Sequence, residues 1–130
     1  MRNDQARLED ILRAISLIER YAGRGRPAFD RDELVQSWMV HHLTLIGEAA
    51  ARLSPALRDS HPEVPWPGVI GMRNVLVHGY FSIDLDEVWA TVERHVPVLR
   101  SQIEKILREL GWGGPRSVSE CVRPYRLAIG

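Results

Sequence analysis

The stretch 30–53, which reads DRDELVQSWMVHHLTLIGEAAARL, decides the fold of this chain. Its apolar residues recur every three or four positions, the spacing that places side chains along one side of an α-helix. The apolar positions are Leu34, Val35, Trp38, Met39, Leu43, Leu45, Ile46, Ala49 and Leu53. Because so many positions are apolar, we expect this helix to be buried at the centre of a helical bundle.

The segments on either side of this central helix read as a helix and a turn. Residues 4–22 carry the same apolar period and predict an amphipathic helix. The glycines and proline of 23–27 then break it and predict a short loop. At the other end, Ser54 followed by Pro55 stops the central helix and suits the start of a short new turn.

A third helix is expected after an irregular segment. Residues 61–68 contain three prolines, and Trp66 within them is expected to be tucked inward as an anchor. Helical spacing of apolar residues then resumes near Pro67 and continues until Gly79, which is a natural stop.

The last helix is expected from Asp84 to Leu110. Asp84 followed by Glu87 has the spacing of an N-terminal capping arrangement, and Pro97 should bend the helix over the preceding turn. No strand, repeat or second domain is suggested. We therefore expect an all-α, four- to five-helix, up-and-down bundle over residues 1–111, with an extended or partly disordered tail over 112–130.

The charge balance and the apolar pattern limit the partners of the chain. Seventeen basic and seventeen acidic residues give a formal net charge of +0, so any RNA contact must be local rather than spread over a basic surface. No window approaches the roughly 18 to 20 apolar residues that cross a bilayer, and no signal peptide begins the chain. A cytoplasmic protein without a membrane segment is expected.

Cys121 is the single cysteine, and no Cys or His cluster has zinc-like spacing.

Chemistry is concentrated in the stretch 71–80, which reads GMRNVLVHGY. Arg73 and His78 are separated by about 140° of rotation on a helix, so they converge only if the helix ends at His78. A histidine at a helix C-terminus is favoured in its protonated form and can serve as acid or base. RNA cleavage without metal needs a base, an acid and a cation for the phosphate charge. His78 and Arg73 match these needs, and Tyr80 suits a hydrogen-bond donor or substrate-orienting group.

The same three residues also suit a structural role. Arg73 would then pair with a carboxylate, His78 would cap carbonyl groups at the helix end, and Tyr80 would pack on the bundle. From spacing alone this structural role is favoured, because three polar residues within eight positions form a weak pattern.

The run Arg73-x4-His78-x-Tyr80 does not stand alone in the sequence. Pro65-Trp66 and Gly71-Met72 precede it, and the stretch 84–89 (DLDEVW) follows it. Residues 46–50 (IGEAA) form another linked segment. Together these segments resemble the HepT branch of the HEPN superfamily over about residues 4–110. The tail 112–130 lies outside the resemblance, and Pro97 departs from it.

The resemblance implies a helical bundle that dimerises so that two Arg-x4-His segments face one groove. It implies a metal-independent endoribonuclease without a cofactor, which is the toxin of a type II or type VII toxin-antitoxin system. The antitoxin would be a minimal nucleotidyltransferase that binds the toxin or adenylylates Tyr80. Asn74 would bond the phosphate or orient His78. Glu48 would lie near the site, where a helix carboxylate or a partner for Arg73 is the favoured interpretation.

A second class of function stays open. The chain could be a HEPN-like helical dimer that binds nucleotide or a partner protein and does not cleave RNA. The presence of Arg73, His78 and Tyr80 together favours the enzyme, because a pure scaffold has no need of all three.

The remaining histidines and tryptophans are expected to be structural. His41 and His42 point about 100° apart on a helix and cannot chelate one ion well, so we expect them in the core or at a dimer face. His61 and His95 have no partner at ligand spacing and are expected at the surface. The tryptophans expected to anchor the core rather than stack on bases are Trp38, Trp66 and Trp89.

Overall fold

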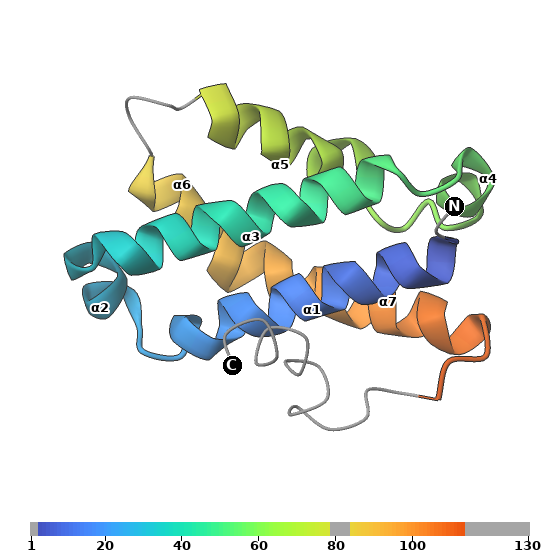
Figure 1. The fold of residues 1–130 in the computed structure, drawn as a ribbon, viewed down its shortest axis with the longest axis horizontal. Coiled ribbons are helices and arrows are strands. Elements are labelled where there is room, and N and C mark those ends of the chain that lie inside the picture. Colours follow the sequence, from blue (N-terminus) through green and yellow to red (C-terminus); the bar gives the residue numbers. More distant parts are fainter. Residues whose placement is uncertain (1–2, 79–83, 114–130) are drawn as a thin grey trace, which may run out of the picture.

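The computed structural model describes residues 3–78 and 84–113, and every regular element within these ranges is helical (Figure 1). The elements are α1 (Asp4–Ala22), α2 (Arg26–Arg31), α3 (Glu33–Ala51), α4 (Pro55–Ser60), α5 (Trp66–His78), α6 (Leu85–Ala90), the π-helical turn η1 (Thr91–His95) and α7 (Val96–Glu109). The expected all-α fold is therefore confirmed.

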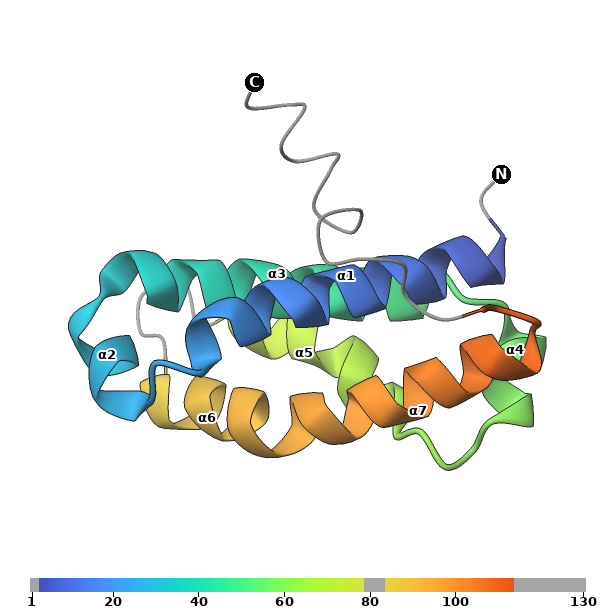
Figure 2. The same cartoon turned by 90° about the horizontal axis from the view of Figure 1, so that it is seen from below.

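The long helices run alternately in opposite directions. In Figure 1, α3 lies between α1 and α5, and it packs against both. In Figure 2, α1 and α3 lie in one layer, whereas α6, η1 and α7 run end to end in the opposite layer. α7 packs against α1 and so joins the two layers. The arrangement is an up-and-down bundle, as the sequence predicts.

The core extends along the length of the bundle, with α3 at its centre. α3 buries Met39, Leu43 and Ile46 completely. Burial of each such side chain contributes about 1.5–3 kcal/mol relative to exposure, so this apolar contact dominates the stability of the bundle. The fully buried side chains of the neighbouring long helices are Leu8, Ile11, Ile15 and Ile18 on α1 and Ile103, Ile106 and Leu107 on α7.

The tryptophans anchor the core as expected. Trp66 and Trp89 are buried, and Phe29 of α2 packs against Trp89 with 5.3 Å between ring centroids. Trp38 is half-buried, and its indole N–H donates to the carbonyl oxygen of Leu17 at 2.8 Å. This hydrogen bond ties α3 to α1.

Polar side chains cap the helices at their N-terminal ends. The Asp32 carboxylate accepts from the backbone N–H of Leu34 at 2.9 Å, and the Asp84 carboxylate accepts from that of Glu87 at 3.1 Å. The predicted capping role of Asp84 is therefore confirmed. Ser54 caps α4, and its hydroxyl also donates to Asp4 at 2.6 Å. This second bond fastens the start of α1 to the α3–α4 junction.

The last helical run bends as its proline predicts. In η1 the backbone N–H of Val96 donates to the carbonyl oxygen of Thr91, five residues earlier. Pro97 follows directly, and proline lacks an N–H and clashes with the carbonyl four residues back in a regular helix. The wider turn accommodates this ring at the junction with α7.

Three details of the fold differ from expectation or extend it. α2 occupies part of the segment expected as a loop, and α3 begins at Glu33 rather than near Asp30. Trp112, at the start of the expected tail, is half-buried against the core, and its backbone N–H donates to Leu107 at 2.9 Å. The rest of that tail, 114–130 with Cys121, lies outside the described residues. Among the described helices, none is long and apolar enough to span a bilayer.

Candidate functional site

The motif residues Arg73 and His78 lie on one helix, α5, of which His78 is the last residue. The structure describes the helical backbone at Arg73, Asn74 and His78, and their side chains lie outside what it describes. Tyr80 falls within 79–83, also outside the described residues. Five helical steps separate Arg73 from His78 by about 140° of rotation and about 7.5 Å along the axis. The helix thus extends to the histidine, as the sequence predicts.

The beginning of α5 is held firmly in the bundle. The buried ring of Trp66 donates its N–H to the carbonyl oxygen of His61 at 3.0 Å. The backbone N–H of Val69 donates to the carbonyl oxygen of Pro65 at 3.0 Å, and the Val69 side chain is buried in the core. These contacts fix where α5 runs against α3 and therefore where its C-terminal half lies.

The chain that follows the motif is held where α6 begins. The guanidinium of Arg26 donates to Asp86 at 2.5 Å and to Asp30 at 2.8 Å. The hydrogen bond to Asp86, followed by that to Asp30, raises the pKa of Arg26 above its ordinary value. The pair lies beside the Asp84 cap at the start of α6. The helices on either side of residues 79–83, α5 and α6, are thus both fixed in the bundle.

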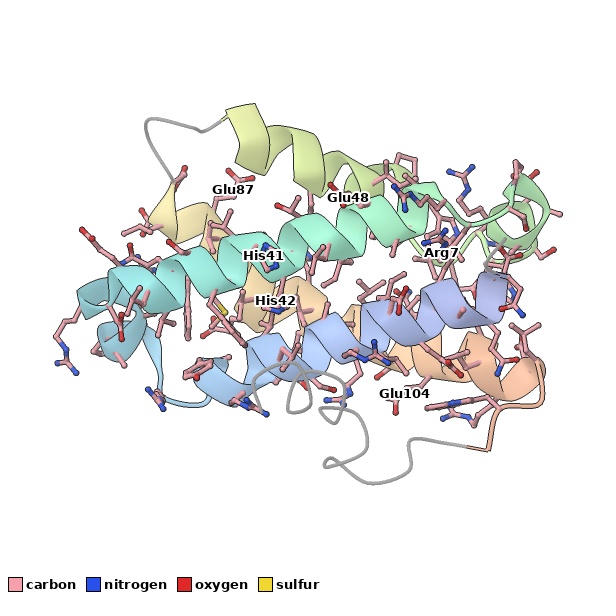
Figure 3. The ribbon with its side chains drawn as sticks, in the orientation of Figure 1. Arg7, His41, His42, Glu48, Glu87 and Glu104 are labelled. Atoms are coloured by element: carbon pink, nitrogen blue, oxygen red, sulfur yellow. The ribbon has the colours of Figure 1, made fainter. Side chains whose placement is uncertain are left out.

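The two histidines of α3 have opposite surroundings (Figure 3). His42 is buried, and its Nδ1 lies 2.8 Å from the carbonyl oxygen of Trp38. His41 is exposed, with 4.9 Å between the two ring centroids in an edge-to-face contact. Burial lowers the pKa of His42, and the neighbouring His41 lowers it further, against the opposite effect of the Trp38 carbonyl. The expected core position is confirmed for His42, whereas His41 lies on the surface.

Glu48 lies in a hollow between α1 and α3. The hollow has a volume of about 170 Å³. Glu48 is exposed and, like Arg7, is labelled in Figure 3. The lining residues are Arg7, Asp10, Arg13 and Ala14 from α1, Leu45, Glu48 and Ala49 from α3, and Arg52, which directly follows α3. Sequence reasoning named Glu48 but not the three arginines around it.

The sequence indicates the positions of these arginines only weakly. Arg52 follows Glu48 by four residues, and such helical spacing places the two on the same side at the end of α3. Arg7 and Arg13 interrupt the apolar period of α1, which marks the polar side of that helix. Nothing in the sequence indicates that these two sides meet, because the pairing of α1 with α3 is a tertiary contact.

His61 differs from its expectation. Its side chain is only 15% exposed, and its ring nitrogens lie 3.4 Å from Glu63 and 3.7 Å from Glu109. The α4–α5 connection is thereby fastened to the end of α7. His95 is exposed, as expected. Among the side chains that the structure describes, no group of three or more His, Cys, Asp or Glu is placed to hold a metal ion.

Comparison with known proteins shows to which family the chain belongs. A family model described as "Ribonuclease HepT-like" matches residues 11–106. The chain belongs to the HepT-like ribonuclease family. The matched residues run from α1 into α7 and include all of α5 with Arg73 and His78. The resemblance drawn from the sequence motifs is confirmed at the level of the family.

Several relatives of this HepT-like chain carry ribonuclease names. A candidate RNase of Caldanaerobacter subterraneus is 34% identical over 110 residues, which cover 84% of this chain and 98% of the relative. A candidate ribonuclease HepT of Thermococcus cleftensis is 36% identical over 100 residues, which cover 76% of this chain and 91% of the relative. A Methanocaldococcus jannaschii protein, named as a gamma-glutamylcyclotransferase and candidate RNase, is 33% identical over 104 residues, 79% of this chain and 47% of that protein. No solved structure matches the chain.

Proposed function

We propose that this HepT-like protein is a metal-independent endoribonuclease and the toxin of a toxin-antitoxin system. The observation that carries the proposal is the match to the ribonuclease family, because it spans α5 and both motif residues on it. The chain also covers 98% of one relative and 91% of another that are named as candidate ribonucleases, so the likeness extends over nearly their whole length.

In the proposed reaction, neutral His78 takes the proton of a ribose 2′-hydroxyl, and the 2′-oxygen attacks the adjacent phosphorus. The bond from phosphorus to the 5′-oxygen breaks, and a protonated imidazole gives its proton to the leaving oxygen. The products are a 2′,3′-cyclic phosphate and a 5′-hydroxyl. Arg73 stabilises the charge on the other phosphate oxygens, and Tyr80 and Asn74 donate hydrogen bonds that orient the substrate.

The proposed active form is a homodimer. One imidazole cannot be the neutral base and the protonated acid in the same step, whereas two copies supply one His78 for each role. The rotation of about 140° between Arg73 and His78 on α5 is compatible with a site that a second copy completes. The local nature of the RNA contact also agrees with the balanced charge of the chain.

The proposed partner is an antitoxin of the minimal nucleotidyltransferase class. It would transfer AMP from ATP to the hydroxyl of Tyr80, breaking the bond between the α- and β-phosphates and releasing pyrophosphate, or would block the site by binding. Tyr80 suits this role because it follows His78 by two residues, so a bulky, negatively charged AMP there would compete with an RNA phosphate.

Expression of the chain alone is expected to arrest bacterial growth, and the purified protein should cleave RNA in the presence of a chelator. His78→Ala should abolish both effects, because it removes the proposed acid and base. His95→Ala, which changes an exposed histidine on η1, is the matched control and should retain both. Coexpression of a minimal nucleotidyltransferase should relieve the arrest. Growth is followed by optical density, and the RNA ends by mass spectrometry.

Two outcomes would contradict the proposal. Complete loss of cleavage in the chelator would contradict a metal-independent reaction. If wild type and His78→Ala were equally harmless and neither degraded RNA, the chain would instead be the non-catalytic dimer that binds nucleotide or a partner protein.

A further inference from the structure

The hollow between α1 and α3 has a small apolar floor and a charged rim. Ala14 and Ala49 are buried at 4% and 8% exposure, whereas the charged side chains around them are half-buried or exposed. Because the floor side chains are short, the two helices leave space above them. The charged residues of the rim are Arg7, Asp10 and Arg13 on α1, Glu48 on α3 and Arg52 directly after α3.

The charges of the rim are only partly paired with one another. Asp10 lies 3.8 Å from Arg13, a weak ion pair on α1. The side chains of Arg7, Arg52 and Glu48 make no ion pair or hydrogen bond with any residue that the structure describes, although all three line the same hollow. Within the described residues, two guanidinium groups and one carboxylate thus line the hollow without a side-chain partner.

This combination of groups matches one sugar-phosphate unit of RNA. Guanidinium groups bind phosphate through paired, charge-assisted hydrogen bonds. A carboxylate only accepts hydrogen bonds, and the ribose 2′-hydroxyl is a donor that distinguishes RNA from DNA. A volume of about 170 Å³ corresponds to roughly six water molecules, which is the scale of a sugar-phosphate unit. None of the lining residues is aromatic, so the hollow provides no ring on which a base could stack.

We propose that the hollow binds a ribose-phosphate of the RNA substrate at a distance from the cleaved bond. Arg7 and Arg52 hold the phosphate, and Glu48 accepts the 2′-hydroxyl. The hollow is lined by α1 and α3, and α3 lies between α1 and α5 (Figure 1), so a strand engaged both at the hollow and at α5 crosses α3. The inference rests on the proposed ribonuclease function. The hollow would give the enzyme a second contact with the RNA strand that does not depend on base sequence. The chain has a net charge of +0, so its overall charge does not attract RNA.

The test measures RNA binding in the full chain carrying His78→Ala, so that the strand is not cleaved. A fluorescent single-stranded RNA is titrated at several salt concentrations. Adding Arg7→Gln and Arg52→Gln should weaken binding about tenfold. It should also reduce the slope of log affinity against log salt by about 0.7, the value of one single-strand phosphate contact. The matched control is Arg94→Gln with Arg108→Gln, which removes two exposed arginines from η1 and α7 and should leave the slope unchanged.

Two further variants separate the chemistry of the site from a loss of charge. Ala49→Leu fills the hollow while every charge stays, and it should weaken RNA binding as the double arginine variant does. Glu48→Met removes the acceptor at similar length, and the ratio of RNA to DNA affinity should fall toward one. Thermal melting followed by circular dichroism confirms that each variant is folded.

Several results would overturn the inference. It is wrong if the arginine pair and its control lower the salt slope equally, or if Ala49→Leu binds RNA as well as the parent does. Saturable binding of free AMP that Ala49→Leu abolishes, with unchanged RNA affinity, would indicate a mononucleotide site instead. These failures are distinct from failure of the proposed function, which would appear as absence of RNA cleavage by the wild type.

Discussion

His42 is a polar side chain inside an apolar helix bundle. Only 3% of the residue is exposed, and its ring lies 4.4 Å from that of Trp38, measured between centroids. Its Nδ1 is satisfied by the carbonyl oxygen of Trp38, so the neutral imidazole is accommodated without an unpaired group on that side. A charged imidazole in this position loses its hydration, which is why burial lowers the pKa of His42.

The free energy of unfolding is expected to fall as the pH is lowered from about 7.5 to about 5.5. A histidine in the unfolded chain takes up a proton near pH 6.5, whereas His42 in the folded chain resists protonation because its pKa is lowered. The unfolded state therefore binds more protons in this range, and lowering the pH favours it. Urea unfolding at the two pH values measures the effect. His42→Gln should lose this part of the decline, and His95→Gln should keep it; equal declines in wild type and His42→Gln would contradict the explanation.

Single residues are predictable from the sequence where a local rule governs them. Asp84 caps α6 as its spacing to Glu87 predicts, and Trp66 is buried as an anchor beside prolines. Glu48 and His61 are different, because the groups around them come from distant parts of the chain. The roles of Arg73, His78 and Tyr80 come from the family resemblance and stay predictions.

At the scale of elements, α6 shows how one short helix depends on its ends. It has only six residues and is too short to be stable alone. Its N-terminus is capped by Asp84, Asp86 in its first turn forms an ion pair with Arg26, and Val88 and Trp89 are buried. The ion pair is exposed and contributes little, so the cap and the buried side chains hold the helix.

Asp84→Ala is expected to lower the free energy of unfolding by about 1 kcal/mol, the typical contribution of an N-terminal cap. Asp84→Asn should retain most of that stability, because an amide oxygen can accept the same hydrogen bond from Glu87. Asp59→Ala, which changes an exposed aspartate on α4, is the control and should shift stability by less than about 0.5 kcal/mol. Chemical denaturation of the three variants measures the differences. An effect of Asp84→Ala no larger than that of the control would show that the cap does not stabilise α6.

Elements are predictable where apolar spacing is regular and less so where it is not. α1 occupies the predicted residues 4–22, because its period is unbroken between a cap and a glycine. α2 was not predicted, since the glycines and Pro27 of that segment indicate a loop, although proline is also favoured in the first turn of a helix. Aspartates at positions 30 and 32 are both acceptable caps, so the start of α3 was displaced by a few residues.

On the scale of the whole molecule, α3 both forms the core and contributes to the surface. Its inner side carries Leu43, which is fully buried between the two layers. Its outer side carries Leu34, which is 82% exposed. One leucine of α3 is therefore buried and another is exposed. The two form a matched pair for measuring how much core packing contributes to the free energy of unfolding.

Leu43→Ala is expected to lower the free energy of unfolding by about 2–5 kcal/mol, because it removes buried methyl groups and leaves a cavity in the core. Leu34→Ala should change it by less than about 0.5 kcal/mol, since that side chain is already in water. Urea denaturation followed by far-ultraviolet circular dichroism provides both values. Similar losses in the two variants would mean that Leu34 is covered in the folded state.

The wide turn η1 also sets how the two halves of the last helical run are phased. Val88, Val92 and Val96 follow at intervals of four residues, and in a regular helix each such step turns a side chain by about 40°. A hydrogen bond to the fifth residue back accommodates one residue more than a regular turn does, and all three valines stay buried. The turn thus accommodates one extra residue while the apolar sides of α6 and α7 stay aligned. Deleting one residue within it would leave the apolar side of α7 facing inward, whereas a deletion within α7 would rotate everything beyond it by about 100°.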